Sequence, residues 1–260
     1  TPPSGSSSTL PTSRPPYCRS IVLVTVMVAV PPGTTVTGSP TTGAAQSKEA
    51  AEQVRVAATV PAAIAPRQVL REDPLVARID GLLSAQECAY LIARAKPKVQ
   101  PSVVIDPQGR SVPNPIRDSH GANFAPVEED LVIHAINCRI AAATGTEWEQ
   151  GEPLHILRYE PGQQYRKHFD ALPGVRNQRV LTCLVYLNDG FDGGATAFTE
   201  GLEVKGGTGD AVIFANTTPD GRADPRTEHA GLPVTKGVKW LATRWIRARR
   251  HHPWEPETMM

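Results

Sequence analysis

After Gly151 the chain becomes a series of short apolar segments separated by turn-forming residues, and this pattern restricts the folds open to it. Several short strands at such spacing are typical of a sandwich or of a double-sheet jelly roll. We therefore expect a jelly-roll core over residues 151–249 and a C-terminal tail at 250–260. The segments that read as strands are 154–159, 163–168, 179–187, 195–198, 210–215, 228–234 and 238–247.

Residues 67–150 carry helical signals and predict a support region for that core. Ser84 and Glu87 form a capping box, which predicts a helix to about Ala95 that Pro97 stops. Residues 127–143 have helical periodicity, and Gly145 is a suitable C-cap. A strand is expected at 74–79. The predicted fold class is mainly β with N-terminal helices, a double-stranded β-helix (jelly-roll) core supported by helices.

Residues 1–66 are rich in Pro, Ser, Thr, Gly and Ala, a composition that buries too little apolar surface to offset ordering entropy. This predicts a mostly disordered leader with a short helix near 48–58. The apolar run at 21–30 is shorter than the roughly 20 residues of a membrane-spanning helix, so no stable membrane insertion is expected. We expect a cytoplasmic protein; secretion or periplasmic export through this run is the alternative.

The formal net charge is +1, so neither nucleic acid nor a cation-binding surface is favoured, and function is expected in a local site. The cysteines are not spaced as zinc ligands, which favours free, buried thiols in a reducing compartment. A disulfide stays open as the alternative. The four cysteines are Cys18, Cys88, Cys138 and Cys183.

Three side chains have the chemistry of a metal site. His168 and Asp170 stand two apart at the end of an expected strand, so both point to the same side. His229 lies in a late expected strand that a jelly roll can bring across the barrel mouth. Two imidazoles and one carboxylate on one face form the facial triad of non-heme iron oxygenases, which leaves positions open for substrates. A His-x-Asp pair alone is weak evidence for a metal site. The alternative for His229 is an ordinary strand histidine that binds no metal.

Alternation along residues 238–247 places Lys239, Leu241, Thr243 and Trp245 on one face of a strand. If this face lines the barrel, an ammonium points among apolar side chains, which is costly without an anion. Lys239 with the Thr243 hydroxyl beside it therefore suggests a carboxylate receptor. An exposed Lys239 with Trp240 inside is the alternative.

The sequence resembles the prolyl 4-hydroxylase family of Fe(II)- and 2-oxoglutarate-dependent dioxygenases. The resemblance extends over roughly residues 75–249 and is densest after Leu157. The matching segments are Leu157–Gly162, Tyr165–Asp170, Gln178–Thr182, Tyr186–Asp189, Gly193–Phe198, Gly209–Phe214, His229–Val234 and Gly237–Trp240. Arg117–Ser119 resembles the family segment that enters the substrate loop, and His120 after it is either a cleft residue or an ordinary loop histidine.

The resemblance implies that His168, Asp170 and His229 bind Fe(II), and that these ligands and Lys239 are the catalytic residues. It implies that Lys239 pairs with the far carboxylate of 2-oxoglutarate. Thr243, Tyr159 and, more weakly, Thr182 would assist, although Tyr159 and Thr182 also read as ordinary strand residues. The substrate residues would be Tyr165, Arg179 and Trp245.

Two of these substrate residues conflict with simple expectations. Tyr165 has the opposite strand parity to His168, so its role needs a local distortion of the strand. Arg179 also reads as a solvated charge at a strand end. Gly193 and Gly194 are expected to supply turn conformations open only to glycine.

The function that the resemblance implies is hydroxylation of an unactivated C–H, with release of succinate and carbon dioxide. The cofactors would be Fe(II), 2-oxoglutarate and O2, with ascorbate as reductant. Prolyl 4-hydroxylation of a peptide or protein is the first expectation, and a free amino acid or small natural product is the alternative. From other classes, a non-catalytic jelly-roll metal or ligand binder and a zinc hydrolase stay open. No nucleic-acid partner is expected, and the oligomeric state is not readable from the sequence.

Overall fold

The structure is a computed structural model that describes residues 40–61, 63–105, 110–112 and 116–254. The chain divides into compact units at 1–38 and 39–260, and all described residues belong to the second. Cys18, the apolar run at 21–30, most of the predicted leader, residues 106–109 and the end of the predicted tail lie outside the described residues.

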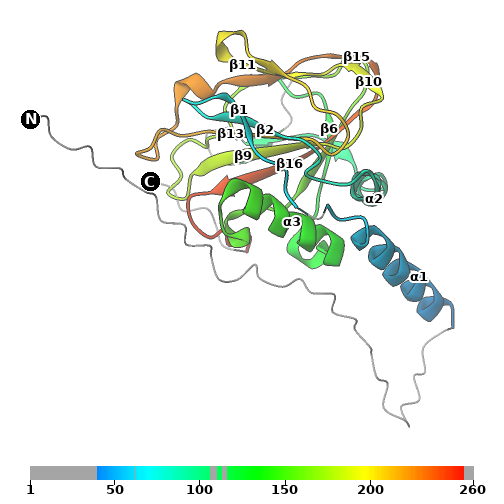
Figure 1. Cartoon of the computed structure of the whole chain (residues 1–260). Helices are drawn as coiled ribbons and strands as arrows, with labels where there is room; N and C mark the ends of the chain where they lie inside the picture. Colours follow the sequence, from blue (N-terminus) through cyan, green and yellow to red (C-terminus); the bar gives the residue numbers. More distant parts are fainter. Residues whose placement is uncertain (1–39, 62, 106–109, 113–115, 255–260) are drawn as a thin grey trace, which may run out of the picture. The chain divides into compact units, whose positions relative to one another are not determined.

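The core is a jelly roll of antiparallel strands, which confirms the predicted fold class (Figure 1). The major sheet has eight strands, in the order β1 (Gln68–Arg71), β2 (Val76–Ile79), β13 (Ala211–Ala215), β9 (Arg179–Tyr186), β16 (Lys239–Arg247), β7 (His155–Tyr159), β6 (His120–Asn123) and β3 (Gln100–Pro101). The minor sheet has four, in the order β12 (Glu203–Val204), β11 (Thr196–Phe198), β14 (His229–Gly231) and β8 (Tyr165–His168). Two smaller pairs join β10 (Phe191–Gly193) with β15 (Val234–Gly237) and β4 (Val104–Ile105) with β5 (Ser111–Val112).

The helices α2 (Ala85–Ala95) and α3 (Leu131–Thr144) begin and end at recognisable caps. The predicted capping box is present at α2: Ser84 Oγ accepts from Glu87 N, and the Glu87 carboxylate accepts from Ser84 N. The α3 helix starts four residues later than predicted because Asp130 is its N-cap and accepts from two backbone amides. Gly145 ends α3 in the left-handed conformation, with φ 72°, as predicted.

The major sheet separates two apolar clusters, and strand alternation assigns neighbouring residues to opposite sides. On one side, Ile156, Val185 and Ala242 pack with the helices. On the other side, Leu157, Tyr186 and Leu241 fill the interior between the sheets. Figure 1 shows α2 and α3 together on the first side. Both faces of β16 are buried, because the helical cluster covers one face and the other faces the jelly-roll interior.

The structure also differs from the sequence expectation in the extent of two elements. The short helix predicted near 48–58 is present as α1, which covers Pro40–Ala57 and so begins earlier than predicted, and it buries Val56 in the helical cluster. The single strand expected at 228–234 is divided into β14 and β15, which belong to different pairs. Pro233 lies between them and cannot donate a backbone hydrogen bond to a ladder.

Three cysteines fall within the described residues, and all are free thiols. Cys88 and Cys183 are buried as expected, whereas Cys138 is half-buried. Burial raises the pKa of both Cys88 and Cys183 to about 12, so neither thiol is a reactive nucleophile. None of the described helices combines the length and the apolar character needed to cross a membrane.

Replacing Ser84 by alanine should lower the free energy of unfolding by about 1 kcal/mol, because Glu87 N loses its acceptor at the start of α2. Ser84→Thr keeps a capping hydroxyl and serves as the matched control. Urea denaturation measures both variants, and equal stability of Ser84→Ala and the parent chain would contradict the assigned cap.

Candidate metal centre

The structure brings together the three side chains that the sequence suggested as metal ligands. In the register of the minor sheet, His168 on β8 lies directly opposite His229 on β14, and their ring centroids are 4.3 Å apart. Asp170 follows β8, with its carboxylate oxygens 3.6 Å from His168 Nε2 and 3.7 Å from His229 Nε2. The ligand atoms of all three lie within 4.8 Å of one another.

Backbone carbonyls orient both imidazoles for metal binding. His168 Nδ1 lies 2.8 Å from Arg166 O, and His229 Nδ1 lies 3.0 Å from Thr227 O. A carbonyl oxygen can only accept, so each Nδ1 carries the hydrogen and each Nε2 presents a lone pair. Burial, with the neighbouring His168, lowers the pKa of His229 to about 4, so this imidazole is neutral at physiological pH.

The third donor, Asp170, is a buried carboxylate that stays ionised. Burial alone would raise its pKa, but at the acidic pH where a carboxyl titrates the charge of a protonated His229, together with His168 and Thr182, outweighs burial and lowers the pKa well below the usual range. Thr182 Oγ1 donates to Asp170 Oδ2 at 2.7 Å. Two imidazoles and one carboxylate are the donor set of a 2-His-1-carboxylate iron site.

A β-bulge resolves the parity conflict at Tyr165. His229 pairs with His168 and Gly231 pairs with Tyr165, so three steps along β8 match two steps along β14. The extra residue turns Tyr165 onto the face of His168. The two rings stack, with centroids 3.4 Å apart and planes 12° apart. Tyr165 therefore lies beside the metal centre, where its predicted substrate role requires it.

The three candidate ligands line a cavity inside the jelly roll together with the inward face of β16. The four residues predicted to share that face all line it: Lys239, Leu241, Thr243 and Trp245. Tyr159, Tyr165 and Arg117 complete its polar wall. Lys239 is 2 % exposed, and Trp240 on the opposite face is also buried because the helices cover that face.

Lys239 is a buried ammonium without a counter-ion. Its Nζ donates to Gly194 O at 2.6 Å and lies 5.4 and 5.1 Å from the ring centroids of Tyr159 and Tyr186. Within the described part of the chain, no carboxylate forms an ion pair with it. Burial, followed by repulsion from Lys205, lowers the pKa of Lys239 to about 7. A bound carboxylate would relieve both effects.

The turn that supplies the Gly194 carbonyl requires glycine, as predicted. Gly193 and Gly194 have φ of 69° and 64°. A Cβ on Gly193 would lie 2.4 Å from Pro233 O, and one on Gly194 would lie 3.1 Å from Lys239 Cδ.

Two further groups around the cavity have hydrogen-bonding capacity to spare. The Thr243 hydroxyl is buried and has no partner among the described residues, and the same holds for Nε and Nη2 of Arg117. The Arg117 guanidinium lies over the Tyr165 ring, 4.8 Å from its centroid. Burial raises the pKa of Tyr159, so its hydroxyl stays protonated and able to donate.

The Arg179 side chain, which could have been a solvated charge at a strand end, is instead largely buried and paired. Its guanidinium forms two hydrogen bonds to Glu152, at 2.6 and 2.7 Å, and lies 4.0 Å from the ring centroid of Trp245. The Trp245 indole nitrogen is buried without a partner among the described residues. Arg179 and Glu152 thus position Trp245 at the wall of the cavity.

Several residues around the site gave no usable signal in the sequence. Glu152 lies two residues before an expected strand, and Asn216 directly follows one, so neither stands out locally. Their importance arises from partners that are distant in sequence. His120 begins β6 instead of lying in a loop, and it is absent from the residues that line the cavity.

The donor set fits Fe(II), and the buried Lys239 with the unpartnered Thr243 hydroxyl fits the far carboxylate of 2-oxoglutarate. The comparisons with known proteins agree. Residues 154–247 match the family model of the 2OG-Fe(II) oxygenase superfamily. This family uses Fe(II), 2-oxoglutarate and O2.

Individual relatives define the branch of that superfamily. Prolyl 4-hydroxylase 1 of Arabidopsis thaliana is 37% identical over 203 residues, which cover 70% of this chain and 72% of that protein. Prolyl 4-hydroxylase 5 of the same plant is 35% identical, over 69% of this chain and 70% of that protein. The chain therefore belongs to the prolyl 4-hydroxylase family of Fe(II)- and 2-oxoglutarate-dependent dioxygenases, and it is an enzyme of this class.

A solved structure shows the same fold. The viral collagen prolyl hydroxylase vCPH of Paramecium Bursaria Chlorella virus-1, in complex with 2OG, superimposes with a TM-score of 0.54 at 31% identity. The match covers 67% of this chain and 96% of the viral chain.

The pKa of Lys239 predicts how stability changes with pH in the ligand-free protein. The ordinary pKa of 10.5 holds in the unfolded chain, whereas the folded value is about 7. Burying the cation therefore costs stability in full below pH 7, and this cost is relieved as pH rises from 7 toward 10.5. The relief is about 1.4 kcal/mol per pH unit at most.

Lys239→Met has no such proton to lose, so its stability advantage over the parent chain should shrink between about pH 6.5 and about pH 8.5. Urea unfolding of both proteins at the two pH values measures this difference. An advantage that is independent of pH would show that Lys239 keeps its ordinary pKa.

Proposed function

We propose that this enzyme hydroxylates a proline residue in a peptide or protein, using Fe(II), 2-oxoglutarate and O2 and releasing succinate and carbon dioxide. The observation that carries the proposal is that a three-ligand cluster and a buried, unpaired ammonium line one cavity. A non-catalytic binder has no need of both features. A zinc hydrolase would leave Lys239 without a role.

His168, Asp170 and His229 would hold the iron through two Nε2 atoms and a carboxylate oxygen. Bound iron and 2-oxoglutarate supply the oxidising chemistry, and the protein supplies position and a water-poor cavity. Thr227 O and Arg166 O hold the two imidazoles in the tautomer that binds metal. These hydrogen bonds would fix the orientation of both rings toward the metal.

Lys239 would bind the far carboxylate of 2-oxoglutarate, with Thr243 and Tyr159 as further donors. Each can donate a hydrogen bond to the carboxylate, which would otherwise be poorly solvated in the cavity. Binding of the anion favours the charged form of Lys239 and so raises its pKa from about 7. The family resemblance suggested Thr182 as another co-substrate residue, but its hydroxyl donates to Asp170, which supports a role on the metal side.

The substrate side of the cavity combines aromatic and cationic groups. Tyr165 and Trp245 would border the bound proline, with Arg179 against the Trp245 ring, and Nε and Nη2 of Arg117 would donate to peptide carbonyl oxygens. The names of the relatives support proline as the target, and the viral protein named as a collagen prolyl hydroxylase supports a peptide chain. Ascorbate would keep the iron reduced. The free thiols Cys88 and Cys183 support a cytoplasmic location.

The reaction is tested with the full chain, Fe(II), 2-oxoglutarate, ascorbate and a proline-rich peptide in air. Mass spectrometry should show a gain of one oxygen atom on a proline, and succinate should form in equal amount. The same peptide with alanine in place of proline should gain nothing. Asp170→Ala should lose activity by at least about a hundredfold, because the metal loses its only anionic ligand.

Two outcomes would contradict the proposal. Oxygen gain by free proline but not by the peptide would assign a small-molecule substrate. Binding of the peptide without succinate release in any condition would assign a non-catalytic binder.

A further inference from the structure

A chain of hydrogen bonds leads away from the carboxylate of the metal centre into the protein interior. Thr182 Oγ1 donates to Asp170 Oδ2 at 2.7 Å, and Asn216 Nδ2 donates to Thr182 Oγ1 at 2.8 Å. Thr182 and Asn216 are both 0% exposed. Neither Thr182 nor Asn216 is among the cavity-lining residues, so these two side chains lie outside the space that substrates would occupy.

The direction of this chain is fixed by chemistry. A carboxylate that binds metal can only accept, so the single hydroxyl proton of Thr182 goes to Asp170. Thr182 Oγ1 can then only accept from a third group, and the Asn216 amide nitrogen is a donor of the required kind. Asn216 Oδ1 is buried without a partner among the described residues. Burying Asn216 Oδ1 without a donor costs stability, and the hydrogen bond from Asn216 Nδ2 to Thr182 offsets part of this cost.

Asn216 also begins the segment that holds a second metal ligand. Residues 217–226 form a loop between β13 and β14, and Thr227 after it provides the carbonyl that accepts from His229 Nδ1. The two ends of the loop are tied together through Asp224. Asp224 N donates to Asn216 O at 3.1 Å, and Thr227 N donates to Asp224 O at 3.0 Å. One short segment therefore orients Asp170 at its start and His229 at its end.

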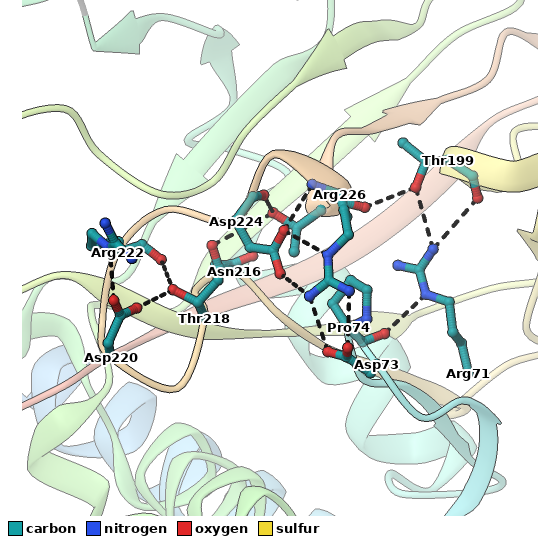
Figure 2. A network of polar contacts seen from close by, with 11 residues as sticks. Arg71, Asp73, Pro74, Thr199, Asn216, Thr218, Asp220, Arg222, Asp224 and Arg226 are labelled. Atoms are coloured by element: carbon teal, nitrogen blue, oxygen red, sulfur yellow. Dashed lines mark hydrogen bonds and ion pairs between the residues drawn. The ribbon is translucent and has the colours of Figure 1, made fainter.

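Polar contacts connect this loop to the hairpin of β1 and β2, as Figure 2 shows. The buried Asp224 carboxylate accepts from Arg226 N at 2.9 Å and from Arg226 Nη2 at 2.7 Å. The same guanidinium binds Asp73 at 2.9 and 3.1 Å, in the turn between β1 and β2. Arg226 O accepts from Thr199 Oγ1, which also accepts from Arg71.

We infer that Asn216 is a positioning residue of the metal centre, which acts through Thr182 to hold Asp170 in its ligating orientation. This inference rests on the proposed function, because it concerns the metal that the enzyme would use. It also gives Thr182 a different role from the predicted one: Thr182 would position the Asp170 carboxylate and would not bind 2-oxoglutarate. Loss of such an outer partner typically weakens metal binding by 10- to 100-fold.

The test measures Mn(II) affinity of the metal-free full chain by calorimetry, without 2-oxoglutarate. Asn216→Asp keeps the size of the side chain, removes the donor and adds a like charge near Asp170. Thr182→Val keeps the shape and removes the hydroxyl, whereas Thr182→Ser restores the hydroxyl. Asp220→Asn is the matched control in the same loop, since Asp220 is exposed and pairs only with neighbouring loop residues Thr218 and Arg222 in the described structure.

Asn216→Asp and Thr182→Val should each bind Mn(II) about 10- to 100-fold more weakly, while Thr182→Ser and Asp220→Asn should stay within about threefold of the parent. The Mn(II) electron paramagnetic resonance spectrum of the two weakened variants should also change, because Asp170 is held differently. At saturating Mn(II), their affinity for 2-oxoglutarate should be unchanged. Should Asn216→Asp not fold, Asn216→Ala takes its place, since it removes the same donor without adding a charge.

Unchanged Mn(II) affinity in Thr182→Val with weakened 2-oxoglutarate binding would overturn the inference and return Thr182 to the co-substrate. Equal Mn(II) affinity in all four variants would overturn it as well. The parent chain separates this failure from failure of the proposed function. If the parent binds Mn(II) and hydroxylates the peptide, only the role of Asn216 is wrong; if the parent does neither, the proposed function fails.

Discussion

The antiparallel register between β8 and β14 places His168 opposite His229, and the rest of the site is arranged around this pair. Backbone hydrogen bonds between the strands bring together two ligands that are far apart in sequence, and a bulge in β8 brings Tyr165 to the same face. Asp170 reaches the pair from the residues that follow β8. A one-residue slip in this register would turn His168 away from the cavity and remove the metal centre.

The part of the site around Lys239 depends on burial of both faces of the major sheet. The helices cover one face of β16, so the other face can line a cavity that excludes most water. Among the described residues, the ammonium of Lys239 contacts a carbonyl and two aromatic rings but forms no ion pair. The cost of burying this cation would be recovered by a bound carboxylate, as the proposed anionic co-substrate requires.

The features that could be predicted from sequence are those set by local spacing. Alternation over 238–247 placed Lys239 and Thr243 on one face, and the capping box at Ser84 located the start of α2. His229 could be named only as a candidate in a late strand until the family resemblance supported it, because a facing register between distant strands leaves no local trace. Tyr165 looked misplaced because a bulge changes parity without a sequence mark. The role of Asn216 depends on partners from two other segments, so no local pattern could indicate it.

The central claim is that one metal and the far carboxylate of 2-oxoglutarate are held together by the three ligands and Lys239. Calorimetric titration of 2-oxoglutarate into the metal-free protein, with and without one equivalent of Mn(II), tests it most directly. The account predicts tight binding only with Mn(II), and binding at least about tenfold weaker in Lys239→Met, because a charge-assisted contact is lost. Binding of 2-oxoglutarate that is indifferent to both the metal and Lys239 would contradict it.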